Sequence, residues 1–128
     1  MVNILVVDDQ SNLRKLIKTN LVASGYNVTT AKSGEDGLKL AQSMKPDLIL
    51  TDIKMPGISG WDMLIKLNAI FDLKQTIVIV MTAFPRESEE NRARKIAIDF
   101  MAKPFSISEL LSKVEKALGE QKRRKFNN

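Results

Sequence analysis

The chain has 128 residues, of which 44% are hydrophobic and 27% charged, the size and composition of one globular domain. It contains no cysteine and no histidine. Disulfides, thiolate metal sites, cysteine nucleophiles and a phosphohistidine on the chain itself are therefore excluded. The side chains left for chemistry are carboxylates, lysines and hydroxyls, which suit hard cations and phosphate.

The formal net charge of +5 is unevenly distributed. Residues 119–128 carry +3, from one glutamate and the four basic residues Lys122 to Lys125, which leaves +2 for the first 118 residues. A nearly neutral body argues against nucleic-acid binding, and the basic tail is too short for more than weak, salt-sensitive attraction. No apolar run approaches the roughly 20 residues of a membrane span, and no signal peptide is recognisable, so we expect a cytoplasmic protein.

Five short segments rich in aliphatic or β-branched residues are predicted as strands: residues 3–7, 26–31, 47–51, 76–81 and 99–102. The first and third are continuous apolar runs, which indicates burial on both faces. Strands that alternate with helices predict an α/β fold, a doubly wound parallel sheet with helices on both faces, because parallel strands need crossover connections.

Apolar residues at helical spacing predict four helices, and residues 87–96 favour a fifth by propensity although they are very polar. Ser33 and Ser106 are expected to cap the second and last helices, and Met44, Met63, Met81 and Met101 to pack in the core. The apolar residues that mark the four helices are Leu13, Leu16, Ile17 and Leu21; Leu38, Leu40, Ala41 and Met44; Trp61, Met63, Leu64, Leu67 and Ile70; Leu110, Leu111, Val114 and Leu118. This pattern predicts one domain over residues 1–119 and a solvated basic tail over residues 120–128.

Polar side chains follow four of the five strands: Asp8 and Asp9, Asp52, Thr82, and Lys103. The binding crevice of an open parallel sheet lies at the carboxyl ends of its strands, so these residues should converge there. Taken alone, each is more often a helix cap, a strand-end residue or a solvated lysine. All four together, each at a strand end, are hard to explain as independent caps.

Three converging carboxylates repel one another unless a cation lies among them. Oxygen ligands without histidine or cysteine select Mg²⁺, Mn²⁺ or Ca²⁺, and Mg²⁺ fits best because it keeps positions open for water and phosphate. Lys103 would add a positive charge and Thr82 a hydroxyl donor. The set therefore predicts a site for a phosphoryl group beside a metal ion.

The chain resembles a bacterial response-regulator receiver domain with the CheY-like fold over residues 2–119. This resemblance implies a flavodoxin-like sheet of order 2-1-3-4-5 with five helices. The matching motifs are Val6-Val7-Asp8-Asp9, Pro46 to Asp52, Met55-Pro56-Gly57 with Gly60, Met81-Thr82-Ala83 and Lys103-Pro104-Phe105.

The resemblance also implies the chemistry of a two-component phosphorelay. Asp52 would accept a phosphoryl group from the phosphohistidine of a histidine kinase or histidine phosphotransferase. Asp8, Asp9, Asp52 and the backbone carbonyl of Lys54 would hold Mg²⁺, with Mn²⁺ or Ca²⁺ as substitutes. Lys103 would pair with one phosphoryl oxygen and Thr82 with another. The Lys103-Pro104 bond would be cis. No turnover of a separate substrate is expected.

Further residues are assigned to switching, lifetime and docking. Phe100 stands where the family has its switch aromatic, and we weigh that role evenly against a plain core position.

Lys54 and Phe84 would flank the water that hydrolyses the acyl phosphate; since neither acts as a base at neutral pH, a long-lived phosphorylated form is expected.

Leu13, with Pro104 and Phe105, would form an apolar patch for the phosphodonor, although helical spacing favours Leu13 as the top of the core stripe.

Two departures from the family pattern are a segment between Thr82 and Lys103 about one residue short, and Ala97-Ile98 where Gly-Ala is common.

Other functions remain as alternatives to a stand-alone receiver whose downstream target is unknown. The chain could be the receiver fragment of a longer regulator. An aspartate-nucleophile phosphohydrolase would need a second acid two positions after Asp52, where Lys54 stands. A flavodoxin-like cofactor binder would need a phosphate loop after the first strand, where Asp8-Asp9-Gln10 would repel phosphate.

Overall fold

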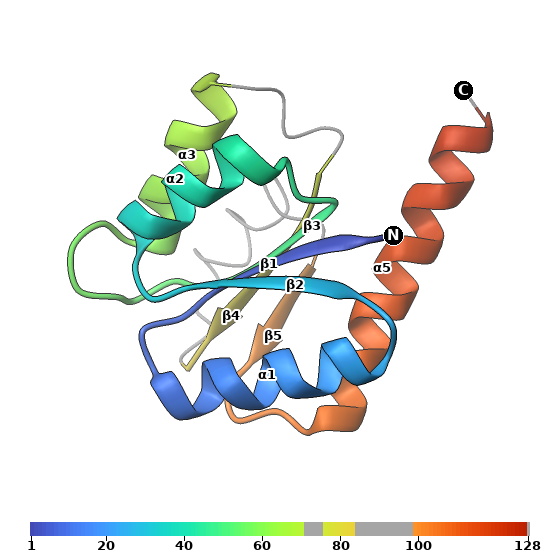
Figure 1. Ribbon diagram of the computed structural model, residues 1–128, viewed down its shortest axis with the longest axis horizontal. Coiled ribbons are helices and arrows are strands. Elements are labelled where there is room, and N and C mark those ends of the chain that lie inside the picture. Colours follow the sequence, from blue (N-terminus) through green and yellow to red (C-terminus); the bar gives the residue numbers. More distant parts are fainter. Residues whose placement is uncertain (71–75, 84–98, 128) are drawn as a thin grey trace.

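The computed structural model describes residues 1–70, 76–83 and 99–127, and it contains one five-stranded parallel sheet. The strand order is β2-β1-β3-β4-β5, as predicted, and every neighbouring pair is parallel (Figure 1). Each predicted strand is present within one residue of its expected ends. The strands are β1 (Asn3–Val7), β2 (Asn27–Ala31), β3 (Leu48–Asp52), β4 (Ile77–Thr82) and β5 (Asp99–Ala102).

The four helices marked by apolar spacing are all present. They are α1 (Ser11–Ala23), α2 (Gly34–Met44), α3 (Gly60–Ile70) and α5 (Ile107–Asn127). The helix predicted over residues 87–96 lies outside the described residues. Helix α5 continues well past Leu118, and its backbone is helical to Asn127.

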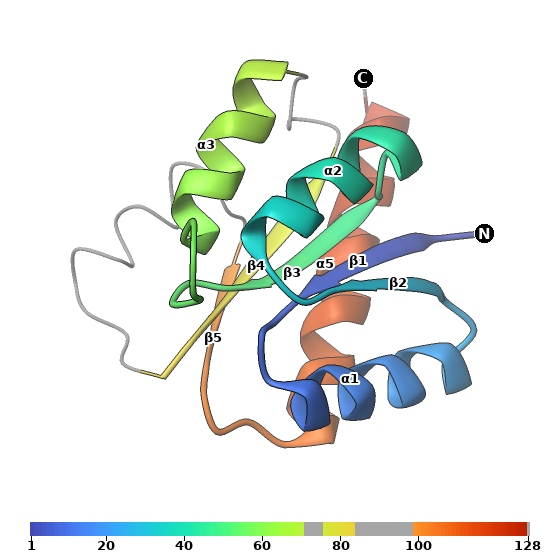
Figure 2. The same cartoon turned by 60° about the vertical axis from the view of Figure 1, so that its left-hand side comes forward.

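Helices cover both faces of the sheet, with α1 and α5 on one face and α2 and α3 on the other (Figures 1 and 2). Successive residues of a strand point to opposite faces of the sheet, so the strands contribute side chains to two separate apolar clusters, one on each face. On the α2 and α3 face, the buried cluster contains Leu5, Val7, Ile49, Val78, Val80, Ala41, Trp61, Met63, Leu64 and Leu67. On the α1 and α5 face, it contains Ile4, Val6, Leu48, Leu50, Ile77, Ile79, Met81, Met101, Ile17, Leu21, Leu110, Val114 and Ala117.

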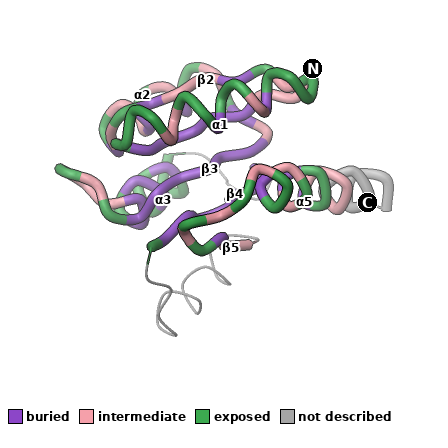
Figure 3. The backbone as a smooth tube through the Cα atoms, turned by 90° about the horizontal axis from the view of Figure 1, so that it is seen from below, coloured by how far each residue is buried: buried purple, intermediate pink, exposed green. Residues whose placement is uncertain are grey.

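Strands β3 and β4 are buried along their whole length (Figure 3). This explains why β3 and β4 are continuous apolar runs in the sequence instead of alternating ones. The predicted core methionines Met63, Met81 and Met101 are fully or almost fully buried, and Met44 is partly buried against the cluster on the α2 and α3 face. No helix in the described part of the chain is long and apolar enough to cross a membrane.

Helix orientation decides which apolar residues are buried. Leu13, Ile17 and Leu21 are four residues apart and share one face of α1, where Ile17 and Leu21 are completely buried. Leu16 is displaced from Ile17 by about 100° around the helix and is 47% exposed. Ile70, at the end of α3, is likewise exposed. Helical spacing therefore located these helices but did not specify every buried position.

Local signals place the helix ends as predicted. The Ser33 hydroxyl accepts a hydrogen bond from the Asp36 amide at 3.1 Å, and the Ser106 hydroxyl accepts one from the Glu109 amide at 3.0 Å. Each bond satisfies an amide that has no partner within the first turn of its helix. Because α2 begins at the carboxyl end of β2 and α5 follows Lys103, both caps lie near the edge of the sheet that carries the polar residues.

Candidate functional site

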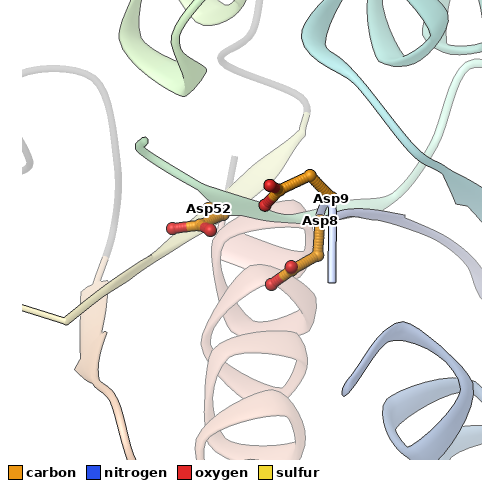
Figure 4. A group of neighbouring side chains, drawn as sticks. All are labelled: Asp8, Asp9 and Asp52. Atoms are coloured by element: carbon orange, nitrogen blue, oxygen red, sulfur yellow. The ribbon is translucent and has the colours of Figure 1, made fainter. Parts of the chain in front are cut away.

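The three predicted carboxylates converge at the carboxyl edge of the sheet (Figure 4). Asp8 directly follows β1, and Asp52 is the last residue of β3, the strand that pairs with β1. One carboxylate oxygen from each of Asp8, Asp9 and Asp52 lies within 4.8 Å of the other two. Asp8 and Asp52 are buried and Asp9 is exposed, so the group opens to solvent on the Asp9 side.

Lys103 lies between the two buried carboxylates. Its Nζ is 2.9 Å from Asp8 Oδ2 and 3.1 Å from Asp52 Oδ2, and only 12% of its side chain is exposed. The Lys103 amide also donates a 2.7 Å hydrogen bond to the Thr82 carbonyl, which ties the residue after β5 to the end of β4. A single ammonium group therefore joins residues that are 95 and 51 positions away from it in the sequence.

The pKa values reflect the burial of the site and the charges that its groups exert on one another. Burial raises the pKa of Asp52 above its ordinary value, the Lys103 hydrogen bond and charge oppose this, and the Asp8 charge adds to the rise. Burial would lower the pKa of Lys103, but its bonds with Asp8 and Asp52 outweigh that effect and raise it. Lys103 therefore stays protonated, and a further cation would relieve the repulsion that remains among the carboxylates.

Backbone amides fix the orientation of both buried carboxylates. Asp8 Oδ1 accepts a 2.8 Å bond from the Gln10 amide, and Asp52 Oδ1 accepts a 2.8 Å bond from the Ile53 amide. Each carboxylate thus has one oxygen held by its own chain segment and the other bonded to Lys103. Charge-assisted bonds of this kind leave little freedom for either group.

Arg14 makes a contact that the sequence pattern did not predict. Its Nη1 donates a 2.7 Å hydrogen bond to the Asp8 carbonyl, which braces the turn between β1 and α1. The only signal in the sequence is a basic residue in the first turn of a helix beside two aspartates. Such residues usually point into solvent, so the contact could not be inferred without the tertiary structure.

Gly60 matched a family motif, and the structure gives the physical reason. A Cβ atom at Gly60 would overlap the backbone carbonyl oxygen of Asp52. The Gly60 amide donates a 2.9 Å hydrogen bond to the Ile53 carbonyl. The start of α3 therefore touches the backbone at Asp52, and the loop over residues 53–59 is closed at its base.

The remaining predicted residues lie around this centre at different depths. Thr82 is buried at the end of β4, in register with Ala102, the residue before Lys103. Lys54 is exposed, and its backbone follows Asp52 by two residues. The Lys103-Pro104 bond is cis, as predicted. Phe84 and the Ala97-Ile98 pair lie outside the described residues.

Among the proposed switch and docking residues that the structure describes, three are partly buried and one is exposed. Phe100 packs against the core on the α2 and α3 face, a position that is compatible with both of its predicted roles. Leu13 and Phe105 pack against the core on the opposite face, and Pro104 is exposed. The side chains of Leu13 and Phe105 thus contribute to the core and are still accessible from solvent.

Comparison with known families identifies this arrangement. The family described as the response regulator receiver domain matches residues 4–115. The chain belongs to this family. A receiver is a signalling module rather than an enzyme that turns over a separate substrate, so the phosphohydrolase alternative is not supported. Membership also implies a histidine kinase as the source of the phosphoryl group.

Three relatives show how far the similarity extends. The receiver is 38% identical over 118 residues to the transcriptional regulatory protein HprR of Escherichia coli, but it spans only about half (51%) of that protein. It is 32% identical over 119 residues to the polar-differentiation response regulator DivK of Brucella ovis, covering 92% of this chain and 97% of DivK. The crystal structure of TrrA from Thermotoga maritima, in complex with Mg²⁺-BeF, is 37% identical with a TM-score of 0.80, covering 91% of this receiver and 99% of TrrA.

The donor atoms of this receiver fit a magnesium ion. Asp8, Asp9 and Asp52 offer only carboxylate oxygens, which are hard ligands, and none of the chain's residues is histidine or cysteine. The charge of Asp8 raises the pKa of Asp52, and a divalent cation between the two carboxylates would reduce this repulsion. The acidic triad is therefore typical of a Mg²⁺ site, and the crystallised complex of the relative TrrA contains that ion.

Proposed function

We propose that this receiver accepts a phosphoryl group on Asp52 from a phosphohistidine donor and signals through the phosphorylated form. The observation that carries the proposal is the pairing of Lys103 with Asp8 and Asp52 in one buried cluster. A receiver needs an anionic nucleophile beside fixed positive charge, because phosphoryl transfer depends on positioning and charge stabilisation. Asp52 meets that requirement, since its neighbours hold it in one orientation.

In the proposed reaction, an Asp52 carboxylate oxygen forms a bond to phosphorus as the bond from phosphorus to the donor imidazole nitrogen breaks. The electron pair of the broken bond stays on the imidazole. Lys103 pairs with one phosphoryl oxygen, and the Thr82 hydroxyl, at the end of the neighbouring strand β4, donates to another. The movement of Thr82 toward the phosphoryl group would link phosphorylation to the surface around Phe100.

Asp8, Asp9, Asp52 and the backbone carbonyl of Lys54 would hold Mg²⁺, and Mn²⁺ or Ca²⁺ would substitute for it. When bound, the ion neutralises negative charge on the carboxylates and on the incoming phosphoryl group. Asp8 and Asp52 already point toward a common centre. Lys103 would then be free to turn from the carboxylates toward the phosphoryl group.

The test is labelling with acetyl phosphate and Mg²⁺, followed by intact mass. We expect one phosphoryl addition, which is lost in EDTA and in Asp52→Asn. Asp62→Asn, an exposed carboxylate in the first turn of α3, is the matched control and should label like wild type. Full labelling of Asp52→Asn, or labelling that ignores EDTA, would contradict the assignment.

A second expectation concerns the lifetime of the phosphorylated form. Lys54 and Phe84 occupy the positions expected to flank the attacking water, and neither side chain is a base at neutral pH. We therefore expect slow hydrolysis, with faster decay in the double variant Lys54→Asn/Phe84→Glu. Decay is followed by intact mass after removal of acetyl phosphate. Equal decay of both proteins would count against this role.

The phosphodonor is proposed to dock over Leu13, Pro104 and Phe105. Leu13 is only partly buried at the start of α1, near the turn that carries Asp8 and Asp9. In Leu13→Ala we expect slower transfer from a purified phosphohistidine donor and unchanged labelling by acetyl phosphate, which needs no docking. Val22→Ala, on the exposed side of α1 near its far end, is the control. Undiminished transfer to Leu13→Ala would return this residue to the core.

The output of the receiver has two candidate forms. In the first form, residues 1–119 are the receiver and residues 120–128 are a basic extension. The phosphorylated receiver then either relays its phosphoryl group or binds a separate target. The near-complete coverage of DivK favours this form. The coverage of only 51% of HprR favours the other, in which the receiver controls an attached output domain. The genomic reading frame distinguishes the two.

A further inference from the structure

We propose that Glu35 is a positioning residue that holds the backbone loop after Asp52, residues 53–59, in the geometry needed for phosphorylation. The inference rests on the proposed function, because that function places the phosphoryl group on Asp52 and a metal ligand in this loop. Glu35 lies in the first turn of α2, whereas Asp8 follows β1 and Asp52 ends β3. Figure 2 shows α2 beside α3 on the same face of the sheet.

The link is a single hydrogen bond between side chain and backbone. Glu35 Oε1 accepts from the Ile58 amide at 2.8 Å, across 23 residues of sequence. This bond is the main reason that the pKa of Glu35 lies below its ordinary value. The carboxylate is exposed, so burial does not force it into place. The Ile58 amide has the largest effect on it, and the Glu35 amide, the Ser33 side chain and the charge of Lys66 have smaller ones.

Two glycines allow the loop to approach α2 closely. A Cβ atom at Gly34 would lie 2.5 Å from Ile58 Cγ1 and 2.8 Å from the Ile58 carbonyl oxygen. A Cβ atom at Gly57 would lie 2.5 Å from Glu35 Oε1, and the positive φ of 85° at Gly57 also favours glycine. Because Gly34 and Gly57 have no side chains, the loop and α2 can come close enough for the bond between Glu35 and Ile58.

The loop is thus held at both ends. At its start, the Ile53 amide bonds to Asp52 Oδ1, and the Ile53 carbonyl accepts from the Gly60 amide. Near its end, Ile58 bonds to Glu35. Lys54, whose carbonyl is the proposed metal ligand, lies between these fixed points. The Ile58 bond therefore adds a restraint to this segment on the side of Lys54 that lies away from Asp52.

Helix α2 also packs against β1, the strand that ends directly before Asp8. A Cβ atom at Gly37 would lie 2.9 Å from Val7 Cγ2 and 2.7 Å from Met63 Sδ, so α2 packs closely on β1 and α3. Val7 immediately precedes Asp8. Helix α2 therefore contacts both the loop after Asp52 and the end of β1 before Asp8. Through these contacts it would help to fix the position of the proposed carbonyl ligand relative to the two carboxylates.

A simpler role for Glu35 is an acidic residue that favours the N-terminus of α2 through the helix dipole. Asp36 stands in the same turn and would serve that role equally. Asp36→Ala is therefore the matched control: it removes an acidic group from the first turn and leaves the loop bond intact. Glu35→Gln retains an oxygen acceptor without the charge, whereas Glu35→Ala removes the acceptor.

The first measurement is hydrogen exchange of the Ile58 amide by NMR, which needs neither metal nor phosphodonor. We expect exchange to be at least about tenfold faster in Glu35→Ala, partly restored in Glu35→Gln and unchanged in Asp36→Ala, since exchange reports local opening. Unchanged exchange in Glu35→Ala would show that the bond does not hold the loop and would overturn the inference.

The second measurement tests the consequence for chemistry. Labelling by acetyl phosphate should be slowed about tenfold in Glu35→Ala, because small displacements of reacting groups carry large rate penalties. Mg²⁺ affinity, titrated through the emission of Trp61, the chain's one tryptophan, should fall in the same variant. Asp36→Ala should match wild type in both measurements, and Glu35→Gln should lie between the two.

The outcomes separate this inference from the proposed function. If wild type labels on Asp52 and Glu35→Ala labels at the same rate with the same Mg²⁺ affinity, Glu35 is not a positioning residue and the proposed function stands. If wild type does not label on Asp52, the proposed function fails and this inference fails with it. A lower melting temperature of Glu35→Ala with an unchanged labelling rate would assign it a purely structural role.

Discussion

The interior of the sheet and its carboxyl edge are built on opposite principles. In β3, Leu48, Ile49 and Leu50 are completely buried and contact apolar helices on both faces. Two residues beyond this strand's apolar run, Asp52 is buried near another carboxylate, Asp8, and both are paired with Lys103. The interior gains stability from nearly every residue, whereas the edge brings like charges together at a cost in stability.

This difference teaches where stability and activity reside. Complete burial of one aliphatic side chain contributes about 1.5–3 kcal/mol, so the two clusters provide a large surplus for folding. Buried like charges raise the free energy of the folded state, and such sites persist where function requires them. Changes in the interior should therefore alter stability without altering the chemistry, and changes at the edge should do the reverse.

The largest expected effect is in the interior. Leu21→Ala removes a completely buried side chain on α1 and should lower the free energy of unfolding by about 2–5 kcal/mol. Denaturant unfolding measures this, and the folded variant should label with acetyl phosphate at the wild-type rate. Leu16→Ala, on the exposed side of the same helix, should change stability by less than about 0.5 kcal/mol. Slow labelling of folded Leu21→Ala would contradict the prediction that changes in the interior alter stability and leave the chemistry unchanged.

Gly37→Ala tests the boundary between the two regions. The added methyl group would press on Val7 and Met63, which should lower stability by about 1–3 kcal/mol. Because Val7 precedes Asp8, labelling should also slow. Gly119→Ala is the control: nothing lies within 4 Å of a Cβ there, and alanine in a helix should raise stability by roughly 0.5–1 kcal/mol. A wild-type labelling rate in folded Gly37→Ala would show that this position affects stability but not the chemistry at Asp52.

A smaller effect of opposite sign is expected at the edge. In EDTA at neutral pH, Asp52→Asn should raise the melting temperature, because burial raises the pKa of Asp52 and its ionised form therefore destabilises the fold. The folded wild type binds a proton there more tightly than the unfolded chain. The loss of wild-type stability that the ionised Asp52 causes should shrink as pH falls through the raised pKa of Asp52, and it should disappear below the ordinary pKa of 3.8. A lower melting temperature of Asp52→Asn would contradict this account.

The smallest expected effect is confined to alkaline pH. Burial, followed by the charge of Glu115, raises the pKa of Tyr26 above 10.0. The stability from the neutral phenol is complete below 10.0 and is lost as pH rises from that value through the raised pKa of Tyr26. Tyr26→Phe should unfold like wild type near pH 7 and resist alkaline denaturation better. Identical alkaline curves would remove Tyr26 from this account.

Local sequence patterns predicted the five strands, the four described helices and the members of the acidic group, whereas the strand order came from the family resemblance. Continuous apolar runs defined β1 and β3 because strands buried on both faces need no polar residues. The caps at Ser33 and Ser106 depend on atoms three residues apart, so they could be predicted from spacing alone. The convergence of Asp8, Asp9 and Asp52 followed from the rule that parallel strands end at one edge.

The tertiary structure decided the contacts that make this edge a working site. Whether Lys103 bonds to Asp8 and Asp52 at once, and whether Arg14 turns back to the Asp8 carbonyl, depends on how strands and helices are seated. The bond from Ile58 to Glu35 is likewise invisible in the sequence. Periodicity and caps are set within a few residues of chain, which the sequence by itself determines. Distances between separate elements depend on the packing of the whole core, which only the folded molecule defines.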